Sequence, residues 1–322
     1  MDGRNDLYDL YPRIEPFEQG VLGLDGGHEM YWEQSGNPYG TPVVFLHGGP
    51  GAGSGPIHRR FFDPSFYRIV VLDQRGAGRS RPYASIENNT TQHLINDLER
   101  LRGHLGIDRW LVFGGSWGSA LGLAYGIAHP TSCLGFVLRG IFLGRTSELD
   151  WFMNGMRMVF PEAWRGFMDF LDEDERQDPL ESYFKRLTDP DPMRHLPAAH
   201  VWSRYESACS NLLPRSSGNF SVGIGDDPGA LTLARIEAHY FRHGMFMDDD
   251  LVLGNLNRIR HLPAVLVQGR YDMVCPIITA DELSRAWPEA RYVVVPDAGH
   301  SAMEPGVRSA LVRATDSLKD RL

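Results

Sequence analysis

Cysteine is scarce in this chain of 322 residues. The three cysteines, Cys133, Cys209 and Cys275, lie far apart and form no C-x-x-C pair. An odd number of widely spaced cysteines indicates neither a disulfide framework nor a zinc knuckle. We therefore expect free thiols, a reducing compartment and no bound metal.

Long apolar runs are absent too. No run approaches the roughly 18 apolar residues that a membrane-spanning helix requires. The N-terminal stretch MDGRNDLYDLYPRIEPFEQG lacks the basic start and the apolar core of a secretory signal. We expect a soluble, cytoplasmic protein that does not engage a membrane.

Positive charge is in deficit. The chain has 32 lysines and arginines against 41 aspartates and glutamates, which gives a formal net charge of −9. This balance argues against a nucleic-acid partner or an anionic membrane surface. Residues 146–250 hold 19 of the acidic residues and 10 of the basic ones, so this segment accounts for the whole net charge.

What is present is the composition of a globular protein, with 42% hydrophobic and 23% charged residues. Short apolar runs, typical of buried strands, alternate with longer stretches of helical spacing. The expected strands are 43–46, 68–72, 110–113, 134–138, 264–268 and 292–295. The expected helices are 91–105, 118–128, 281–287 and 308–318. This alternation predicts an α/β fold with a mostly parallel central sheet flanked by helices on both faces.

Two segments depart from this alternation. Residues 20–24 and 30–34 flank an Asp-Gly-Gly turn, so we expect an antiparallel hairpin at the edge of the sheet. Residues 146–250 show no strand of this type but three stretches of helical character, 151–170, 201–213 and 230–243. We interpret residues 146–250 as a helical cap domain above the carboxyl edge of the sheet, where open α/β sheets bind ligands. Residues 1–145 and 251–322 would together form the catalytic domain.

A strand, a tight turn and a helix meet at Gly114-Gly115-Ser116-Trp117-Gly118. The pattern is G-x-S-x-G, which places a serine hydroxyl on a strained turn at the end of a strand. The glycines keep side chains away from the neighbouring backbone, and the helix directs its N-terminus at developing negative charge. An ordinary surface serine on a glycine-rich strand end is the alternative. The strand and the helix on either side favour Ser116 as a nucleophile.

A serine hydroxyl needs a base, and after such a turn the acid and the histidine follow in that order along the chain. Asp272 comes shortly after the expected strand 264–268, and His300 after the expected strand 292–295. Asp297 is a competing acid, but it lies only three residues before the histidine on the same loop. The order and the strand-end placement predict a triad of Ser116, Asp272 and His300.

The negative oxygen that forms in such a reaction needs two backbone donors. One is expected from the N–H of Trp117, directly after the nucleophile. The other is expected from Gly49, in the loop HGGPG (47–51) that follows the strand 43–46. This loop lacks the G-x-G-x-x-G or GK[ST] spacing of a nucleotide-binding loop.

The sequence resembles the proline iminopeptidases, serine peptidases of the α/β-hydrolase fold, through nearly its whole length. The motifs that carry the resemblance are FLHGGPGAGS (45–54), HRRFFDP (58–64), DQRGAGRS (73–80), ENNTT (87–91), FGGSWGSALGLAY (113–125), GRYDMVCP (269–276) and GHS (299–301). The resemblance implies an exopeptidase that releases N-terminal proline from peptides and needs no metal or organic cofactor. It assigns the same three residues to the triad and the same two N–H groups to the oxyanion hole.

The resemblance also implies two substrate-binding glutamates in the cap. Glu206 follows Trp-Ser-Arg-Tyr, and Glu237 lies within Ala-Arg-Ile-Glu-Ala-His-Tyr-Phe. In the family, glutamates at these positions bind the cationic imino group at the N-terminus of the substrate. A carboxylate pair neutralises such a cation where water is excluded. Without the resemblance, both residues would be taken for ordinary helix-surface acids.

Three further residues, Arg139, Phe142 and Phe241, resemble those that wall the proline-ring pocket of the family. The sequence also departs from the family pattern at two places. Tyr205 stands where the family usually has Trp, and Tyr83 where it has His. These departures concern the breadth of the proline pocket rather than the fold or the triad.

Two other functions remain open from the residues. An esterase, amidase or lactonase for small substrates would use the same triad, and equally fast cleavage of an N-blocked proline substrate would indicate it. A hydrolase-fold binding protein without activity is disfavoured by the intact triad residues. An epoxide hydrolase or dehalogenase would carry Asp rather than Ser at position 116. The sequence carries no signal for an oligomeric state.

Overall fold

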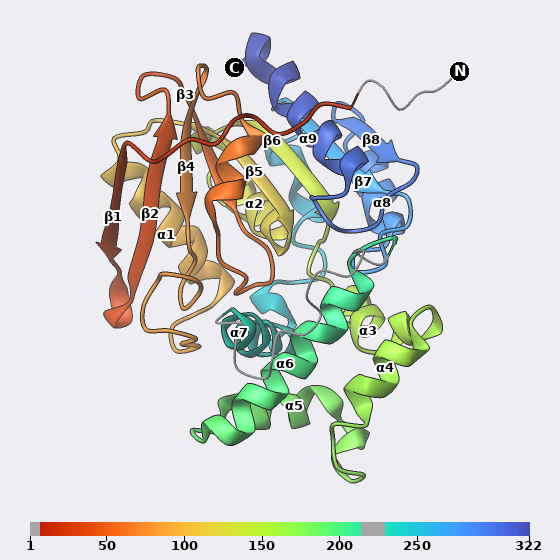
Figure 1. Cartoon of the computed structure of the whole chain (residues 1–322). Helices are drawn as coiled ribbons and strands as arrows, with labels where there is room; N and C mark the ends of the chain where they lie inside the picture. Colours follow the sequence, from red (N-terminus) through yellow and green to blue (C-terminus); the bar gives the residue numbers. More distant parts are fainter. Residues whose placement is uncertain (1–6, 214–228) are drawn as a thin grey trace.

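One sheet of eight strands runs through the molecule (Figure 1). The computed structural model describes residues 7–213 and 229–322. Strands β3 to β8 pair in parallel in the order β4-β3-β5-β6-β7-β8, which confirms the predicted mostly parallel sheet. The strands are β1 (Glu18–Gly23), β2 (Glu29–Gly36), β3 (Thr41–Leu46), β4 (Tyr67–Leu72), β5 (Trp110–Ser116), β6 (Cys133–Ile141), β7 (Ala264–Gly269) and β8 (Arg291–Val295).

The six predicted apolar runs all form strands. β7 is buried along its whole length, and β5 is buried up to the residue before Ser116. Strands that are covered on both faces read as continuous apolar runs, which is why these could be found in the sequence. Several strands continue beyond the runs. β6, for example, reaches Ile141, which pairs with Ser116.

The hairpin expected at the sheet edge is present. β1 and β2 pair antiparallel and are joined by a 3₁₀ turn at Asp25–Gly27. Gly26 in this turn has a φ of +62°, a conformation that favours glycine. β2 then pairs antiparallel with β4, so the hairpin extends the sheet on the side opposite β8.

Helices cover both faces of the sheet, and the sheet separates the apolar core into two clusters. Helices α1 (Thr91–His104), α2 (Trp117–Ala128) and α8 (Ile277–Ala286) lie on one face, and α9 (Pro305–Leu318) lies on the other. The apolar residues under α1, α2 and α8 continue into the helices of residues 146–250, and we call them the α2-side cluster. The residues under α9 form the α9-side cluster.

Residues 146–250 are helical, with no strand in their described part. Their helices gather at one end of the sheet (Figure 1). A Cβ on Gly51, in the loop after β3, would collide with the carbonyl oxygen of Thr232, so α7 presses directly on that loop. The helical segment therefore covers the carboxyl edge of the sheet. Its helices are α3 (Thr146–Asp150), a π turn (Trp151–Gly155), α4 (Pro161–Met168), α5 (Pro179–Thr188), α6 (Pro192–Cys209) and α7 (Ala230–Arg242).

Three of these helices differ from the prediction. α3 and α5 were not expected, and α6 begins at Pro192 rather than at residue 201. α5 and α6 both begin with proline in the first position, where the missing N–H would have no helical acceptor in any case. The preceding residues, Asp178 and Asp191, cap the helices by accepting hydrogen bonds from the first turn. The prolines that look like turn signals in the sequence are therefore helix starts.

Candidate active site

Ser116 lies at a sharp turn between a strand and a helix. It is the last residue of β5, and α2 begins at Trp117. Its φ of +57° and ψ of −127° are rarely adopted by residues other than glycine. A Cβ on Gly118 would collide with the Leu46 carbonyl oxygen, and one on Gly114 would collide with the Gly118 carbonyl oxygen. The G-x-S-x-G pattern is thus a strained elbow that leaves no room for side chains at its glycines.

Asp272 and His300 form a buried pair after β7 and β8. His300 Nδ1 lies 2.8 Å from Asp272 Oδ2 and 3.0 Å from Oδ1. The carboxylate also accepts hydrogen bonds from the Cys275 N–H at 2.8 Å and from Gln268 Nε2 at 3.1 Å. A carboxylate that accepts from Nδ1–H leaves Nε2 as the basic nitrogen of the imidazole. The competing acid, Asp297, is exposed to solvent.

Ser116 and His300 line the same cavity, but no hydrogen bond joins their side chains among the bonds of the described residues. Ser116 Oγ lies 3.9 Å from Cys275 Sγ, and His300 Nε2 lies 3.2 Å from Arg139 Nη1. Arg139 Nη1 also donates to the His300 carbonyl oxygen at 2.8 Å. The two side chains would have to approach each other before Nε2 could accept the serine proton. Such loose geometry is common in enzymes without substrate.

The cavity that holds the reacting groups has a volume of about 370 Å³. Ser116, His300, Gly49, Arg139 and Glu206 all line it. A larger hollow of about 1140 Å³ lies along β8 and α9, but it contains none of the residues predicted for the site. The smaller cavity is therefore the candidate active site.

The two N–H groups that the sequence suggests as oxyanion donors belong to Gly49, in the loop after β3, and to Trp117, at the start of α2. Gly49 and Gly51 have φ of +104° and +99°, conformations that favour glycine. Trp117 is the first residue of α2, so its N–H has no acceptor within the helix. Gln74 joins the two segments, because its Nε2 donates to the His47 carbonyl oxygen and its Oε1 accepts from Trp117 Nε1, each at 2.9 Å.

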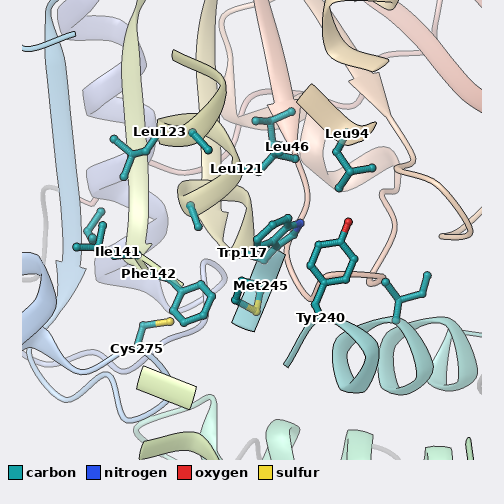
Figure 2. Packing of buried hydrophobic residues seen from close by; sticks show 14 of the residues in the cluster. Leu46, Leu94, Trp117, Leu121, Leu123, Ile141, Phe142, Tyr240, Met245 and Cys275 are labelled. Carbon is teal, nitrogen blue, oxygen red and sulfur yellow. The ribbon is translucent and has the colours of Figure 1, made fainter. Parts of the chain in front are cut away.

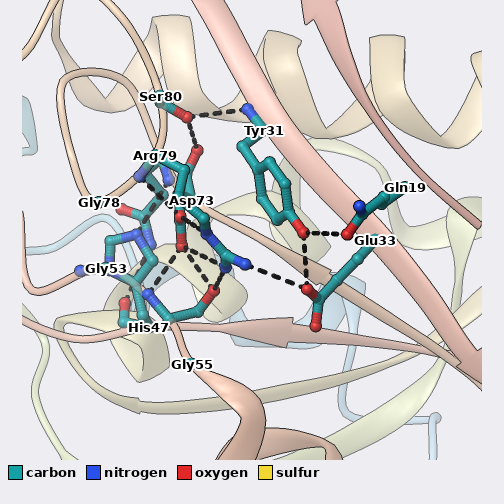
Figure 3. Close-up of polar contacts among 12 residues, drawn as sticks. Gln19, Tyr31, Glu33, His47, Gly53, Gly55, Asp73, Gly78, Arg79 and Ser80 are labelled. Atoms are coloured by element: carbon teal, nitrogen blue, oxygen red, sulfur yellow. Dashed lines mark hydrogen bonds and ion pairs between the residues drawn. The ribbon is translucent and has the colours of Figure 1, made fainter. Parts of the chain in front are cut away.

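A network of charged side chains anchors the loop 47–55 (Figure 3). Asp73 accepts hydrogen bonds from the Ser54 N–H and from Arg79 Nε, both at 2.7 Å. Glu33 binds Arg79 at 3.1 Å and Arg59 at 2.6 Å. Burial opposes the charge on Asp73, but its hydrogen bonds from Arg79 and Ser54 outweigh burial and keep its pKa below the usual value. The motif DQRGAGRS (73–80) thus supports the loop that contains Gly49.

Glu206 and Glu237 lie on the neighbouring helices α6 and α7 and interact electrostatically. Glu237 is buried, and its Oε2 accepts from Trp202 Nε1 at 2.6 Å. Glu206 Oε2 is buried and has no hydrogen-bond partner among the described residues. Burial raises the pKa of Glu206 to about 7, and burial together with the charge of Glu206 raises the pKa of Glu237 well above its usual value. A buried carboxyl pair of this kind favours a cationic ligand.

Phe142 and Phe241 both belong to the α2-side cluster. Phe142 directly follows β6, and Phe241 lies in the last turn of α7, where it packs edge-on against Phe152 with ring centroids 5.0 Å apart. Figure 2 shows Phe142 in this cluster together with Cys275. Both aromatic side chains are thus on the side of the sheet from which the cap helices continue.

Arg139 projects from the opposite face of the sheet. In β6, Val137 belongs to the α9-side cluster and Leu138 to the α2-side cluster, so alternation directs Arg139 to the α9 side. A Cβ on Gly115 would lie 2.5 Å from Arg139 Nη2, which agrees with this placement. The structure brings Arg139 to His300.

Three residues of the site were not identified in the sequence. Gln268 is fully buried in β7, where its side chain donates to Asp272 and accepts from the Ile141 N–H. Glu304 accepts hydrogen bonds from the N–H groups of Gly299 and Leu212. Gln74, described above, is the third. A glutamine within an apolar strand was an available signal for Gln268, because such residues are rarely buried without a partner.

The part of the chain that the structure describes, residues 7–213 and 229–322, holds no group of three or more His, Cys, Asp or Glu side chains arranged to bind a metal ion. None of its helices is long and apolar enough to cross a bilayer. Cys133, Cys209 and Cys275 are buried free thiols.

Sequence comparisons relate this chain to the α/β hydrolases and to proline iminopeptidases. The alpha/beta hydrolase fold model matches residues 41–307. A probable proline iminopeptidase from Leptolyngbya boryana is 51% identical over 309 residues, which are 95% of this chain and 96% of that protein. A proline iminopeptidase from Arabidopsis thaliana is 50% identical over 96% of this chain and 82% of that protein. One from Xanthomonas citri is 50% identical over 95% of this chain and 98% of that protein.

Solved structures of lower identity share the architecture. A putative aryl esterase from Burkholderia cenocepacia has a TM-score of 0.63 at 17% identity, over 94% of this chain and 99% of that one. A proline iminopeptidase-related protein from Thermus thermophilus has a TM-score of 0.59 at 21% identity, over 96% of this chain and 100% of that one. These structures show the fold alone, whereas the sequence matches extend over nearly the full length. The chain therefore belongs to the proline iminopeptidase family and has the α/β-hydrolase fold.

Proposed function

We propose that this chain is a prolyl aminopeptidase, a serine exopeptidase that releases proline from the free N-terminus of peptides. One observation carries the proposal: the cavity that contains Ser116 and His300 is also lined by Glu206, which is paired with Glu237. An exopeptidase of this kind must recognise the cationic imino group at the end of its substrate. Glu206 lines the cavity of Ser116 with one buried carboxyl oxygen, and the buried Glu237 interacts with it, so the pair meets that requirement. The names of the relatives point to the same activity.

The first half of the reaction forms an acyl-enzyme. Ser116 Oγ attacks the carbonyl carbon of the N-terminal proline while His300 Nε2 accepts the hydroxyl proton. Asp272 orients His300 through Nδ1 and stabilises the imidazolium. The N–H groups of Gly49 and Trp117 receive the negative oxygen. The C–N bond then breaks, and His300 returns the proton to the leaving amine.

The second half of the reaction releases proline. A water molecule gives a proton to His300 Nε2 and attacks the acyl carbon. The tetrahedral intermediate collapses, and the bond to Ser116 Oγ breaks as His300 returns the proton to the serine. In both halves Nε2 must face Ser116, so we infer that it leaves Arg139 Nη1 when substrate binds.

We further propose a division of labour between two parts of the chain. Residues 1–145 and 251–322 would form the catalytic domain, with the triad and both oxyanion donors. Residues 146–250 would form the cap, which contributes Glu206, Glu237 and Phe241 to substrate binding. We place this activity in the cytoplasm, because the three buried free thiols suit a reducing compartment.

Replacement of the nucleophile tests the mechanism. Ser116→Ala removes the attacking oxygen, and we expect kcat for prolyl-naphthylamide to fall by on the order of 10⁴-fold or more. Ser284→Ala is a matched control, because the Ser284 hydroxyl donates to a carbonyl within α8, away from the cavity. Undiminished hydrolysis by Ser116→Ala would refute the assignment.

An N-acylated substrate tests recognition of the cationic end. N-acetylprolyl-naphthylamide keeps the scissile bond but carries no positive charge. Relative to prolyl-naphthylamide, which has a free amino group, we expect kcat/KM to fall about 100-fold, because the carboxyl pair loses its cationic partner. Equal rates for the two substrates would indicate a general esterase or amidase instead.

A further inference from the structure

The active-site cavity continues beyond Ser116 on the side of the sheet that faces α9. We call this part the far compartment and define it by six residues that line the cavity: Phe45, His58, Phe61, Phe113, Ala302 and Leu311. Four of them, Phe45, Phe61, Phe113 and Leu311, belong to the α9-side cluster. Nothing in the proposed mechanism uses this compartment.

The far compartment and the proposed proline-ring residues lie on opposite sides of the nucleophile. Phe142 and Phe241 belong to the α2-side cluster, which continues into the cap helices. Phe45 in β3 and Phe113 in β5 belong to the α9-side cluster, on the opposite face of the sheet. Ser116, at the end of β5, stands between the two clusters.

The wall of the far compartment is aromatic. Phe45 stacks on His58 with ring centroids 4.4 Å apart and an angle of 13° between the planes. Phe113 lies 5.7 Å from Phe45 and 5.4 Å from Phe61, measured between ring centroids. These rings form a continuous surface for an apolar side chain.

The far compartment carries no formal charge at neutral pH. Burial lowers the pKa of His58 to about 4, so its imidazole is neutral, and its Nδ1 accepts a hydrogen bond from the Gly55 N–H at 3.0 Å. Arg139 and Glu206 are the charged side chains among the described lining residues. Arg139 is held at His300, and Glu206 extends from the cap. A charged side chain in the compartment would therefore lose water without gaining a partner.

We propose that the far compartment binds the side chain of the second residue of the peptide substrate and selects an apolar one. The inference rests on the proposed function. If the imino cation is bound at Glu206 and Glu237 and the carbonyl carbon at Ser116, the chain beyond the scissile bond must leave on the side away from the cap. The far compartment lies on that side, because four of its lining residues belong to the α9-side cluster.

A series of prolyl dipeptide amides tests the preference. The substrates are Pro-Leu-NH₂, Pro-Phe-NH₂, Pro-Asp-NH₂ and Pro-Lys-NH₂, with prolinamide as the reference that has no second residue. Burial of a leucine or phenylalanine side chain gains affinity, whereas burial of either charge loses it. We expect kcat/KM, measured as proline release, to be about 10-fold or more higher for the apolar pair than for both charged substrates.

A charge introduced into the compartment should redirect the preference. In His58→Asp a carboxylate replaces the neutral ring, and we expect the Pro-Lys-NH₂ to Pro-Leu-NH₂ ratio of kcat/KM to rise about 10-fold. Loss of folding cannot produce this gain. His261→Asp is the matched control, since His261 is exposed and precedes β7, at the end of the strand away from the site.

A second variant covers the case in which His58→Asp does not fold. Ala302→Leu narrows the compartment from its partly exposed rim, so the Pro-Phe-NH₂ to prolinamide ratio should fall about 10-fold. Equal rates for all four dipeptide amides would overturn the inference while proline release from prolinamide still supported the proposed function. The inference also fails if His58→Asp shifts the ratio no more than His261→Asp does. No proline release from any substrate would refute both proposals.

Discussion

Glu206 combines a buried carboxyl oxygen with a proposed role in substrate binding. Its Oε2 is buried without a hydrogen-bond partner among the described residues, and its neighbour Glu237 is a second acid. Such a group is costly to ionise alone, and it becomes favourable when a cation binds. The raised pKa of Glu206 follows from this cost and leads to two pH predictions.

Substrate binding should strengthen as pH rises toward 7. Burial raises the pKa of Glu206 to about 7, so the carboxyl is protonated below that pH and cannot pair with the imino cation. In the Ser116→Ala background, we expect Kd for Pro-Leu-NH₂ to fall up to about 10-fold per pH unit between pH 5 and 7 and to level off above. Calorimetric titration measures this directly, without contribution from the reaction. If Ser116→Ala with Glu206→Gln showed the same step at pH 7, another group would be responsible.

The stability of the fold should decrease as pH rises, whereas substrate binding should strengthen. A carboxyl whose pKa is raised on folding stabilises the protein below its ordinary pKa of about 4.3, and this contribution is lost as pH rises through about 7. We expect the thermal midpoint of the wild type to fall, relative to that of Glu206→Gln, between pH 5 and 8. Parallel midpoints for the two proteins over this range would contradict the assignment of the raised pKa.

At the scale of elements, hydrogen bonds link the end of helix α6 to the loop that carries His300. The Ser210 carbonyl oxygen, just after α6, accepts from the His300 N–H at 3.1 Å and from the Ser301 N–H at 2.9 Å. Glu304 adds a second link, because its carboxylate accepts from Leu212 N–H at 2.7 Å and from Gly299 N–H. The helix that carries Glu206 and the loop that carries His300 are therefore held in a fixed relative position.

Removal of this link should affect binding and chemistry together. Glu304→Ala leaves the two N–H groups unpaired, and we expect kcat for prolinamide to fall and KM to rise, with kcat/KM lower by about 10-fold. Glu304→Gln should recover part of the loss, since its amide oxygen can accept one of the bonds. Glu289→Ala, which removes an exposed ion pair with Arg260, is the control. If Glu304→Ala matched this control in kcat and KM, the link would have no role in positioning.

The elements differ in how well they could be predicted. Strands β5 and β7 were found because burial on both faces produces an uninterrupted apolar run. Helices α5 and the first part of α6 were not predicted, and each begins with a proline, a residue that also marks turns. Proline at a first helical position cannot be told from proline in a turn until the following residues are seen to pack.

At the scale of the whole molecule, charge is distributed unevenly. The entire net charge of −9 falls within residues 146–250, and the predicted substrate end is cationic. A negative surface near a cavity raises the local concentration of cations, and salt screens the effect over about 8 Å at physiological ionic strength. The proposed cap would therefore favour the approach of peptides with a free N-terminus.

This distribution predicts a salt dependence. We expect kcat/KM for Pro-Leu-NH₂ to fall by about 2- to 10-fold between low and high ionic strength. Neutralisation of two exposed acids of the segment, Glu173→Gln with Asp174→Asn, should reduce that slope. The control is Glu87→Gln with Asp320→Asn, which removes the same charge from exposed positions outside the segment. A rate unaffected by salt would exclude electrostatic attraction by this segment.

The order of residues along the chain was enough to identify the strands, the elbow at Ser116 and the candidates Asp272 and His300. These features depend on local apolar runs and on the rule that parallel strands end at one edge of the sheet. Only the tertiary structure decided that Glu206 and Glu237 interact, that Gln74 joins the loop after β3 to the start of α2, and that Arg139 faces the α9 side. Burial and contact between distant residues arise from packing, and no local pattern encodes them.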